Sequence, residues 1–131
     1  AASDVYKRQM EYTRENSMNT HAVPNYIIEN TIQYIVQNLA GNLSLDTIAQ
    51  ELHISPSHLS RTFKKATSCS LTEYINKERI HKAKELLHNT DLLTYEIAEA
   101  VGYKDATYFS SIFRRYEGLS PSEYKTKFFV Q

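Results

Sequence analysis

Hydroxyl and basic side chains alternate with apolar residues between positions 57 and 64. Spacings of three and four place four of the polar side chains on one face of a helix: Ser57, Ser60, Arg61 and Lys64. Hydroxyl and guanidinium groups form directional hydrogen bonds, and the planar fork of Arg61 can bond the O6 and N7 atoms of a guanine together. A phosphate contact and a solvent-exposed position are the alternatives for Arg61. These residue types fit a helix that lies in a DNA groove.

The other reactive side chains lack the pattern of a catalytic or metal site. His81, Glu85 and His88 could share one helix face, but the run is not His-Glu-x-x-His and no thiol lies near it. Cys69 has no sequence signature of a nucleophile, and we expect an exposed loop thiol. As the only cysteine it cannot form an internal disulfide, which fits a reducing cytoplasm. We expect no enzyme activity, no metal and no cofactor.

A short helix is predicted before the polar face. Ser44 is suited to cap its N-terminus, and the negative charge of Asp46 in the first turn interacts favourably with the helix dipole. The helix has one apolar face, formed by Leu45, Ile48, Ala49 and Leu52. A break at residues 53–54 ends it.

The polar face itself belongs to a second helix. Ser55 is suited to its N-cap, and Pro56 fits the first helical position, where a missing N–H costs nothing. Leu59 and Phe63, four residues apart, point away from the polar face. Two short helices joined by a short turn, the second with a polar and basic outer face, are typical of a helix-turn-helix. A helical hairpin whose polar face merely meets water is the alternative.

The chain then repeats this unit. Ile48-Ala49 recurs as Ile97-Ala98, an offset of 49 residues, and from Leu59 onward the offset is 50. Five matches follow the second offset: Ser60 with Ser110, Phe63 with Phe113, Lys64-Lys65 with Arg114-Arg115, Ser70 with Ser120, and Glu73-Tyr74 with Glu123-Tyr124. The offset changes at the turn between the two helices, where an insertion is tolerated best. The repetition predicts two units of the same build.

Net charge does not identify a partner, because the basic and acidic residues number 15 each. A nucleic-acid binder of this composition must depend on where its charges lie. The basic pairs at 64–65 and 114–115 end the two presumed recognition helices. Acidic residues lie on the helices before them, namely Asp46, Glu51, Glu96 and Glu99. The charge is therefore sorted by element.

Helices are also predicted on both sides of the first unit. Residues 25–39 carry an inward apolar stripe, with Gly41 as the C-cap: Ile28, Ile32, Ile35, Val36 and Leu39. Ser70-Leu-Thr-Glu73 is a capping box that opens a helix to about His88. Six of its residues can face the two units in turn: Leu71, Tyr74, Ile75, Ala83, Leu86 and Leu87. At ~1.5 Å per residue its roughly 18 residues span about 27 Å, the order of one DNA turn of about 34 Å.

The second unit is predicted in the same way. Thr94 caps a helix that runs to Val101, residues 102–105 form the turn, and residues 106–116 form the second recognition helix with Phe109 and Phe113 inward. Ser120-Pro-Ser-Glu123 is a capping box for a closing helix to about residue 128. The tyrosines are predicted as core or capping residues rather than base-stacking groups. The predicted fold class is all-α, with about seven helices.

Residues 1–24 are predicted to lie outside the folded domain. Ala1–Gln9 show no helical or strand period and resemble a translated adapter, and residues 10–24 are typical of a linker or disordered arm. The chain lacks an initiator Met, so we expect a fragment of a longer protein. The expected DNA-binding domain covers residues 25–131, with a first subdomain at 25–69, a connecting helix at 70–89 and a second subdomain at 90–131. No apolar run approaches 18 residues, so no membrane span is expected.

Six passages resemble the DNA-binding domain of AraC/XylS-type bacterial transcription regulators: Leu45-Asp-Thr-Ile-Ala, Ser57-His-Leu-Ser-Arg-Thr-Phe-Lys-Lys, Arg79-Ile-His-Lys-Ala-Lys-Glu-Leu-Leu, Glu96-Ile-Ala-Glu-Ala-Val-Gly-Tyr-Lys-Asp, Tyr108-Phe-Ser-Ser-Ile-Phe-Arg-Arg and Ser120-Pro-Ser-Glu-Tyr. The resemblance covers about residues 25–127. It implies two helix-turn-helix subdomains on a linking helix, each with one helix in the major groove. It also implies an N-terminal sensor or receiver domain, which would explain the missing start.

The resemblance further implies the site residues. Base-reading positions are Ser57, Ser60, Arg61, Ala106, Thr107, Ser110 and Ser111. Phosphate-side positions are Lys64, Lys65, Lys104, Arg114 and Arg115, and His58 is a further phosphate candidate with plain exposure as its alternative. Ser68 departs from the family's usual Gly after the first recognition helix. Because Ser111 replaces a long basic side chain and Ala106 offers no hydrogen bond, we expect weak base readout by the second unit.

The expected function is that of a cytoplasmic, sequence-specific transcription regulator, classed as an activator. Its expected partners are double-stranded promoter DNA, RNA polymerase and the N-terminal sensor or receiver domain. The runner-up interpretation is a helical protein-interaction module that contacts RNA polymerase or a sensor domain.

Overall fold

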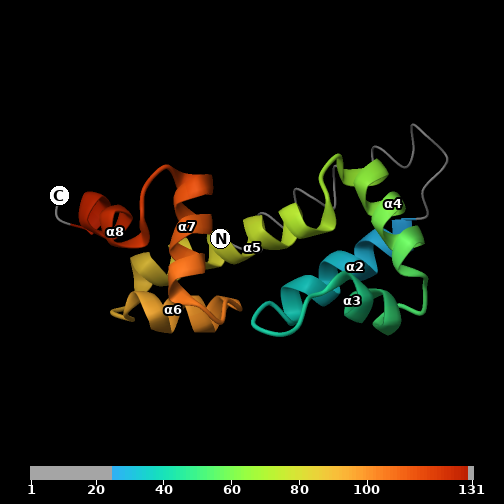
Figure 1. Cartoon of the computed structure of the whole chain (residues 1–131), viewed down its shortest axis with the longest axis horizontal. Coiled ribbons are helices and arrows are strands. Elements are labelled where there is room, and N and C mark those ends of the chain that lie inside the picture. The colour runs from blue at the N-terminus through green and yellow to red at the C-terminus, as the bar shows by residue number, and fades with distance from the viewer. Residues whose placement is uncertain (1–24, 130–131) are drawn as a thin grey trace.

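The structure, a computed structural model, describes residues 25–129, and its regular elements are all helices (Figure 1). In this range there are seven: α2 (Asn25–Gln37), α3 (Leu45–Glu51), α4 (Pro56–Thr67), α5 (Leu71–Asn89), α6 (Thr94–Val101), α7 (Ala106–Glu117) and α8 (Pro121–Phe129). The predicted all-α class with two units on a connecting helix is confirmed. The predicted arm at residues 1–24 lies outside the described range.

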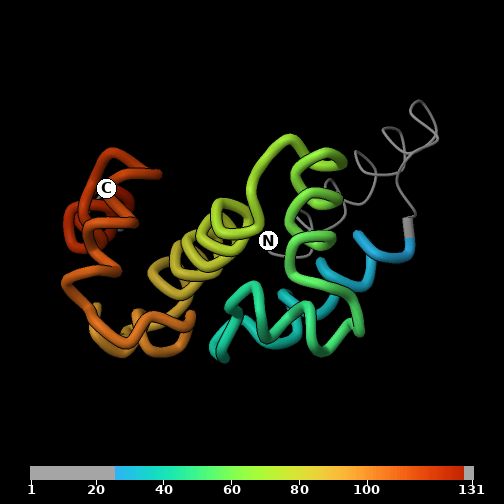
Figure 2. The backbone as a smooth tube through the Cα atoms, turned by 45° about the vertical axis from the view of Figure 1, so that its right-hand side comes forward, coloured from blue at the N-terminus to red at the C-terminus, as the bar shows by residue number. Residues whose placement is uncertain are grey.

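The connecting helix α5 separates two groups of helices. Helices α2, α3 and α4 lie at its beginning, and α6, α7 and α8 gather around its other end (Figures 1 and 2). The tube in Figure 2 shows α5 running obliquely from one group to the other. None of the described helices combines the length and the apolar character needed to cross a bilayer.

The core of the first unit is built from α2, α3, α4 and the start of α5. Ile28, Ile32 and Ile35 on α2 have no exposed surface, as their spacing of three and four predicts. Phe63 on α4 is also fully buried, and its ring meets Tyr74 of α5 edge to face with centroids 5.4 Å apart. The first turns of α5 are therefore part of this core.

The core of the second unit takes the later turns of α5. Ile80, Ala83 and Leu87 of α5 are buried among residues of α6, α7 and α8. Phe113 of α7 lies at the centre, with ring centroids 5.9 Å from Phe109 and 5.5 Å from Tyr124. Among the described residues, no buried residue belongs to both cores. The inward placement predicted for both halves of α5 is confirmed.

Three predicted serine caps are confirmed at the helix starts. Each hydroxyl accepts a hydrogen bond of 3.1 Å from the backbone N–H three residues later: Ser44 at α3, Ser55 at α4 and Ser70 at α5. At α8 the capping box is complete, because Ser120 Oγ accepts from the Glu123 N–H and Glu123 Oε1 accepts from the Ser120 N–H. These caps satisfy N–H groups that a helix start leaves unpaired.

Two predictions about the first helix are wrong. Val36 is 36% exposed rather than inward, because at about 100° per residue it lies about 40° beyond Ile32, at the edge of the stripe that Ile28, Ile32 and Ile35 form. Helix α2 ends at Gln37, and Gly41 is not its left-handed C-cap, since Gly41 is absent from the described residues of positive φ. The Gly41 N–H instead donates to the carbonyl oxygen of Asn38 at 2.8 Å, within a turn.

Two further corrections concern Thr94 and Cys69. Thr94 is the first residue of α6 and not its cap; the Glu96 carboxylate accepts a hydrogen bond from the Leu93 N–H at 2.9 Å instead. Cys69 is buried rather than exposed. Ser68 adopts the left-handed conformation, φ 63°, that the family's usual Gly would adopt, and this turn directs Cys69 into the first core.

Candidate nucleic-acid interface

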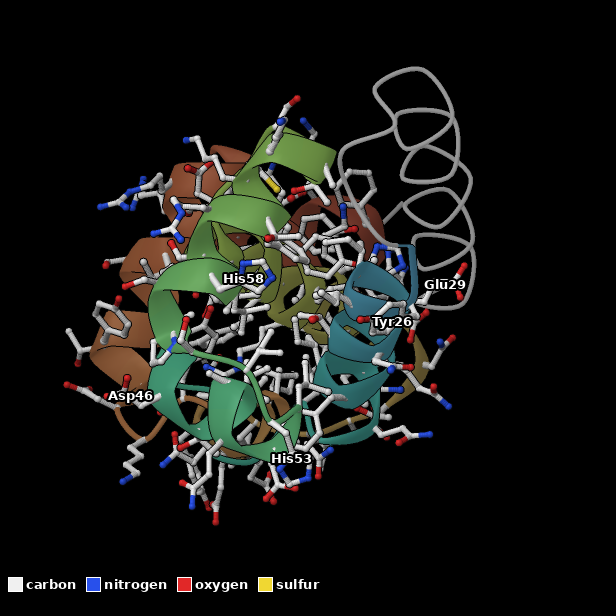
Figure 3. The ribbon with its side chains drawn as sticks, turned by 90° about the vertical axis from the view of Figure 1, so that its right-hand side faces the viewer. Tyr26, Glu29, Asp46, His53 and His58 are labelled. Atoms are coloured by element: carbon white, nitrogen blue, oxygen red, sulfur yellow. The ribbon has the colours of Figure 1, made fainter. Side chains whose placement is uncertain are left out.

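The outer face of α4 presents the residues predicted for the first unit. Leu59, Thr62 and Phe63 are buried on its inner side. The opposite side exposes all predicted members: Ser57, His58, Ser60, Arg61, Lys64 and Lys65. Figure 3 shows His58 on α4, near the outer surface of the first unit. The structure thus brings hydroxyl, guanidinium and ammonium groups together on one helix face.

The outer face of α7 is smaller and less polar. Asp105 caps the helix by accepting the Thr107 N–H at 2.8 Å. Thr107 and Ser111 are exposed, whereas Ala106 and Ser110 are half-buried. The Ser111 hydroxyl donates to the carbonyl oxygen of Tyr108 at 3.2 Å, so its proton is already used within the helix. Few free hydrogen-bonding groups remain on this face.

The basic residues of the second unit differ in their surroundings. Lys104 and Arg115 are exposed. Arg114 forms an ion pair with Glu123 of α8, with Nη2 3.3 Å from Oε1. Hydrogen bonds from the Ser120 backbone and side chain, and then the charge of Arg114, hold the pKa of Glu123 below its usual value. Arg114 therefore lies beside a carboxylate that is charged at neutral pH.

Helices α4 and α7 stand in similar positions at the two ends of α5. In Figure 1 both rise from a turn near the lower edge of the molecule to a turn near its upper edge. At the lower turns lie the N-termini with Ser57 and Thr107, and the basic pairs 64–65 and 114–115 lie at the other ends. The repeat in the sequence is thus a repeat in space.

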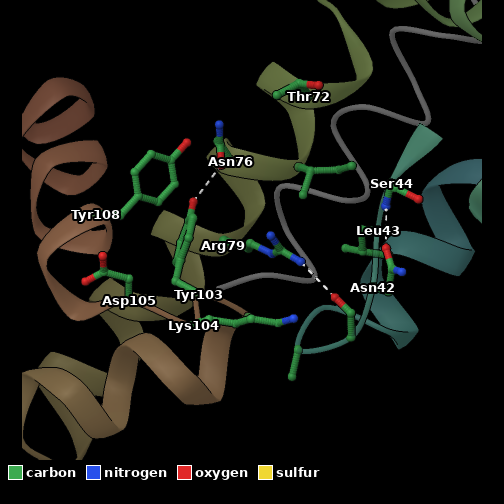
Figure 4. A pocket seen from close by; sticks show the side chains of 14 residues that line it. Asn42, Leu43, Ser44, Thr72, Asn76, Arg79, Tyr103, Lys104, Asp105 and Tyr108 are labelled. Carbon is green, nitrogen blue, oxygen red and sulfur yellow. Dashed lines mark hydrogen bonds between the residues drawn. The ribbon is translucent and has the colours of Figure 1, made fainter. Parts of the chain in front are cut away.

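A groove of about 790 Å³ lies between the two units (Figure 4). We call it the inter-unit groove; its walls are the turn 40–44, one side of α5, the turn 102–105 and Tyr108. Asn42, Thr72 and Asn76 give it a polar lining, and Lys104 lies at its rim in Figure 4. The predicted phosphate position Lys104 therefore lies between the units rather than on a recognition helix.

Tyr108 is a surface residue of α7 that the sequence did not predict. Its side chain is 52% exposed, and its ring lies edge to face with Tyr103 at 5.9 Å between centroids. The offset of 50 places Tyr108 at the position of His58, which is exposed on α4. The alignment of Tyr108 with His58 could have predicted that Tyr108 is exposed. It did not, because the tyrosines were predicted as core or capping residues.

Arg79 of α5 has a structural role that the sequence did not predict; it appeared only as the first residue of one of the six family-like passages. Its Nε donates to the carbonyl oxygen of Leu39 at 3.1 Å, and its Nη2 donates to that of Gly41 at 3.0 Å. Its guanidinium carbon lies 5.4 Å from the centre of the Tyr103 ring. The Tyr103 hydroxyl in turn donates to Asn76 Oδ1 at 2.7 Å (Figure 4). Since the carbonyl partners are about 40 residues away in sequence, no local pattern reveals this contact.

The titratable residues on the later part of α5 are engaged with neighbouring side chains. His81 Nε2 lies 3.8 Å from Glu85 Oε1, and His88 Nε2 forms a hydrogen bond of 3.0 Å with the Tyr124 hydroxyl. Within residues 25–129 no three His, Cys, Asp or Glu side chains are arranged to hold a metal ion.

Comparisons with known proteins point to one class. A family model described as a helix-turn-helix domain matches residues 48–127. The HTH-type transcriptional regulator YijO of Escherichia coli (strain K12) is 39% identical over 98 residues, which are 75% of this chain and 35% of that protein. The lactose operon transcription activator of Staphylococcus xylosus is 32% identical over 126 residues, 96% of this chain and 45% of that protein. The chain spans less than half the length of both relatives.

The fold is similar to that of a solved domain as well. The C-terminal domain of AraT, a response regulator from Geobacillus stearothermophilus, superimposes with a TM-score of 0.76 at 36% sequence identity. The match covers 81% of this chain and 88% of that chain.

Proposed function

This chain belongs to the AraC-type helix-turn-helix DNA-binding domains of bacterial transcription regulators, and we propose that it reads a promoter by placing α4 and α7 in successive segments of the major groove. The observation that carries the proposal is the spatial repeat: two recognition helices of equal length, 12 residues each, are held at opposite ends of one connecting helix. A major groove is wide enough to admit one α-helix.

Base reading is assigned to the N-terminal and middle residues of the two helices. In the first unit these are Ser57, Ser60 and Arg61, all exposed. In the second they are Ala106, Thr107, Ser110 and Ser111. Arg61 is the strongest reader among them, because its guanidinium matches the two acceptors of guanine and has no ion-pair partner in the described chain that would need to be displaced.

Phosphate contacts are assigned to basic groups beside these faces. They are His58, Lys64, Lys65, Lys104, Arg114 and Arg115. Lys64 and Lys65 lie in the last turn of α4, and Arg114 and Arg115 lie in the last turn of α7. Such cations at the C-terminal end also complement the helix dipole. Phosphate contacts of this kind fix the position of the domain on DNA, whereas base contacts give its sequence preference.

The function of the full-length protein is proposed by analogy with its relatives. The similar domain of AraT is C-terminal in a response regulator, and the lactose operon relative is an activator more than twice as long as its matched region. We therefore infer a cytoplasmic regulator with an N-terminal sensor or receiver domain that activates transcription through RNA polymerase.

The test is a selection of binding sequences from random duplexes, followed by titration of the selected DNA with the purified domain. Two enriched segments should appear, with centres about 10–10.5 base pairs apart, because that is one turn of B-DNA. Arg61→Ala should abolish the preference at one position. Lys77→Ala removes an exposed cation of α5 outside the recognition helices and serves as the matched control. Enrichment of a single segment, or of none, would contradict the proposal.

A further inference from the structure

The two units touch each other directly, outside their shared helix. The turn after α2 supplies the carbonyl oxygens of Leu39 and Gly41, and the turn before α7 supplies Gly102 and Tyr103. Arg79 of α5 lies between these turns at the base of the inter-unit groove (Figure 4). We call this contact the Arg79 brace.

The brace has very little free space. Gly102 has a φ of +106°, and a Cβ atom added there would lie 2.7 Å from Arg79 Nε and would also collide with the Leu39 carbonyl oxygen. Any side chain at position 102 would therefore push the two turns apart. The first unit, Arg79 and the second unit are in van der Waals contact at this point.

The brace is also directional. A guanidinium holds its N–H donors in a fixed plane, and here two of them are aimed at two carbonyl oxygens of the first unit. The same group lies 5.4 Å from the centre of the Tyr103 ring of the second unit, which suits a cation–π contact. Tyr103 is itself fixed to α5 by its hydrogen bond to Asn76. A lysine could supply the charge but not the fork.

The Arg79 brace matters because α5 alone does not fix the position of α7 relative to α4. The two hydrophobic cores share no buried residue in the described chain, so bending or twisting of α5 would move α7 relative to α4 without disturbing either core. A contact away from the helix axis resists that motion. On B-DNA one base pair corresponds to a rotation of about 35°, so a small twist of α5 changes which spacing of two segments fits.

We propose that Arg79 is a positioning residue that sets the spacing and phase of the two DNA segments read by α4 and α7, an inference that rests on the proposed two-helix binding mode. Rigid linkage of two binding elements raises affinity only for a target of matching geometry. The brace should therefore determine spacing selectivity and not the affinity of either recognition helix for its own segment.

The experiment uses the selected duplex and a series with one or two base pairs inserted or removed between the segments. For the parent domain, a change of one base pair should weaken binding by about tenfold or more, because the second contact is lost. For Arg79→Ala the same change should cost less than about threefold. A duplex with only the segment read by the first unit should bind parent and variant equally.

Two variants distinguish the effect of the Arg79 hydrogen-bond geometry from the effect of its positive charge. Arg79→Lys keeps the positive charge but loses the fork, so it should show the relaxed spacing of Arg79→Ala with the salt dependence of the parent. Lys77→Ala loses one charge from the same helix and should keep the parental spacing preference. If Arg79→Ala retains the tenfold preference, the inference is wrong. If the parent itself shows no spacing preference, the two-helix binding mode is wrong instead.

A measurement without DNA tests the brace independently of the binding mode. Spin labels on Lys65→Cys and Arg115→Cys, in a Cys69→Ser background, report the distance between the ends of α4 and α7. The distance distribution should be narrow in the parent and with Lys77→Ala, and broader with Arg79→Ala. Equal widths in all three proteins, with melting curves that show each is folded, would overturn the inference.

Discussion

Arg61 of α4 and Ser111 of α7 occupy equivalent positions of the two units, 50 residues apart, yet only Arg61 projects a free hydrogen-bonding fork into solvent. The Ser111 hydroxyl donates to the carbonyl oxygen of Tyr108 in its own helix. The buried sides of α4 and α7 repeat each other, but their outer faces differ in how many hydrogen bonds they can offer to DNA bases.

The first prediction follows from this inequality. Arg61→Ala should lose about 1–3 kcal/mol on the preferred site and flatten the preference at one base pair, because a bidentate guanine contact disappears. Ser111→Ala should change both quantities by less than about 0.5 kcal/mol, because its hydroxyl is engaged within α7. Titration of each variant against single-base operator variants at fixed salt measures both effects. Greater loss of specificity with Ser111→Ala would reverse the assignment of the readers.

The second prediction concerns salt. About five phosphate contacts imply a slope of log K against log salt of roughly −4 to −5. Arg115→Ala should reduce the magnitude of that slope by about one. Arg114→Ala should reduce it by less, since Arg114 already has the Glu123 carboxylate beside it. Titrations at several salt concentrations give the three slopes, and a parental slope near zero would remove the electrostatic part of the proposal.

The third prediction concerns the two buried phenylalanines of the recognition helices. Phe63→Ala and Phe113→Ala should each lower the free energy of unfolding by about 3–5 kcal/mol, because both rings are fully buried. Urea unfolding followed by circular dichroism measures the loss. Tyr95→Ala, which removes an aromatic ring that is 60% exposed on α6, is the matched control and should have a small effect. Parental stability in both phenylalanine variants would show that these helices are not packed as described.

The fourth prediction is a pH dependence at Glu78. Its side chain is 1% exposed, and burial, assisted by the charge of Glu85, raises its pKa to about 7. The folded protein therefore keeps a proton that the unfolded chain releases near pH 4.5. Between about pH 4.5 and 7 stability should fall as pH rises, by up to about 3 kcal/mol from this group, and level off above that range.

Glu78→Gln removes that titration. The variant should equal the parent near pH 4.5 and exceed it in stability at pH 8, because no charge is then buried. Urea unfolding at four pH values between 4.5 and 8 gives the comparison. Parallel pH profiles for the two proteins would show that Glu78 is charged in the fold.

Most of the fold could be predicted from the sequence because helix caps and apolar stripes depend on interactions between residues a few positions apart. The serine caps at 44, 55 and 70 bond backbone groups three residues away, and the stripe of Ile28, Ile32 and Ile35 reflects the turn of a single helix. Such rules hold whatever the rest of the chain does. Val36 failed because it borders that stripe, where the neighbouring helices decide what is covered.

The features that sequence could not supply depend on distant residues. Arg79 bonds carbonyl groups of residues 39 and 41, which only the assembled units bring near. Cys69 was predicted as exposed from its place in a loop, but the left-handed Ser68 directs it inward. The assignment of individual residues to bases and phosphates stays a prediction, since it depends on the path of the DNA.

The separation of the two cores has a consequence for biosynthesis. Within residues 25–129, the buried members of the first core lie between Ile27 and Ile75, and those of the second lie between Ile80 and Tyr124. A ribosome delivers the chain from its N-terminus, and domains generally fold as units in that order. Once the first turns of α5 have left the exit tunnel, the first unit has every apolar residue it needs. It can then fold while the second unit is still being translated, and the finished half of α5 offers a template on which the remaining helices assemble.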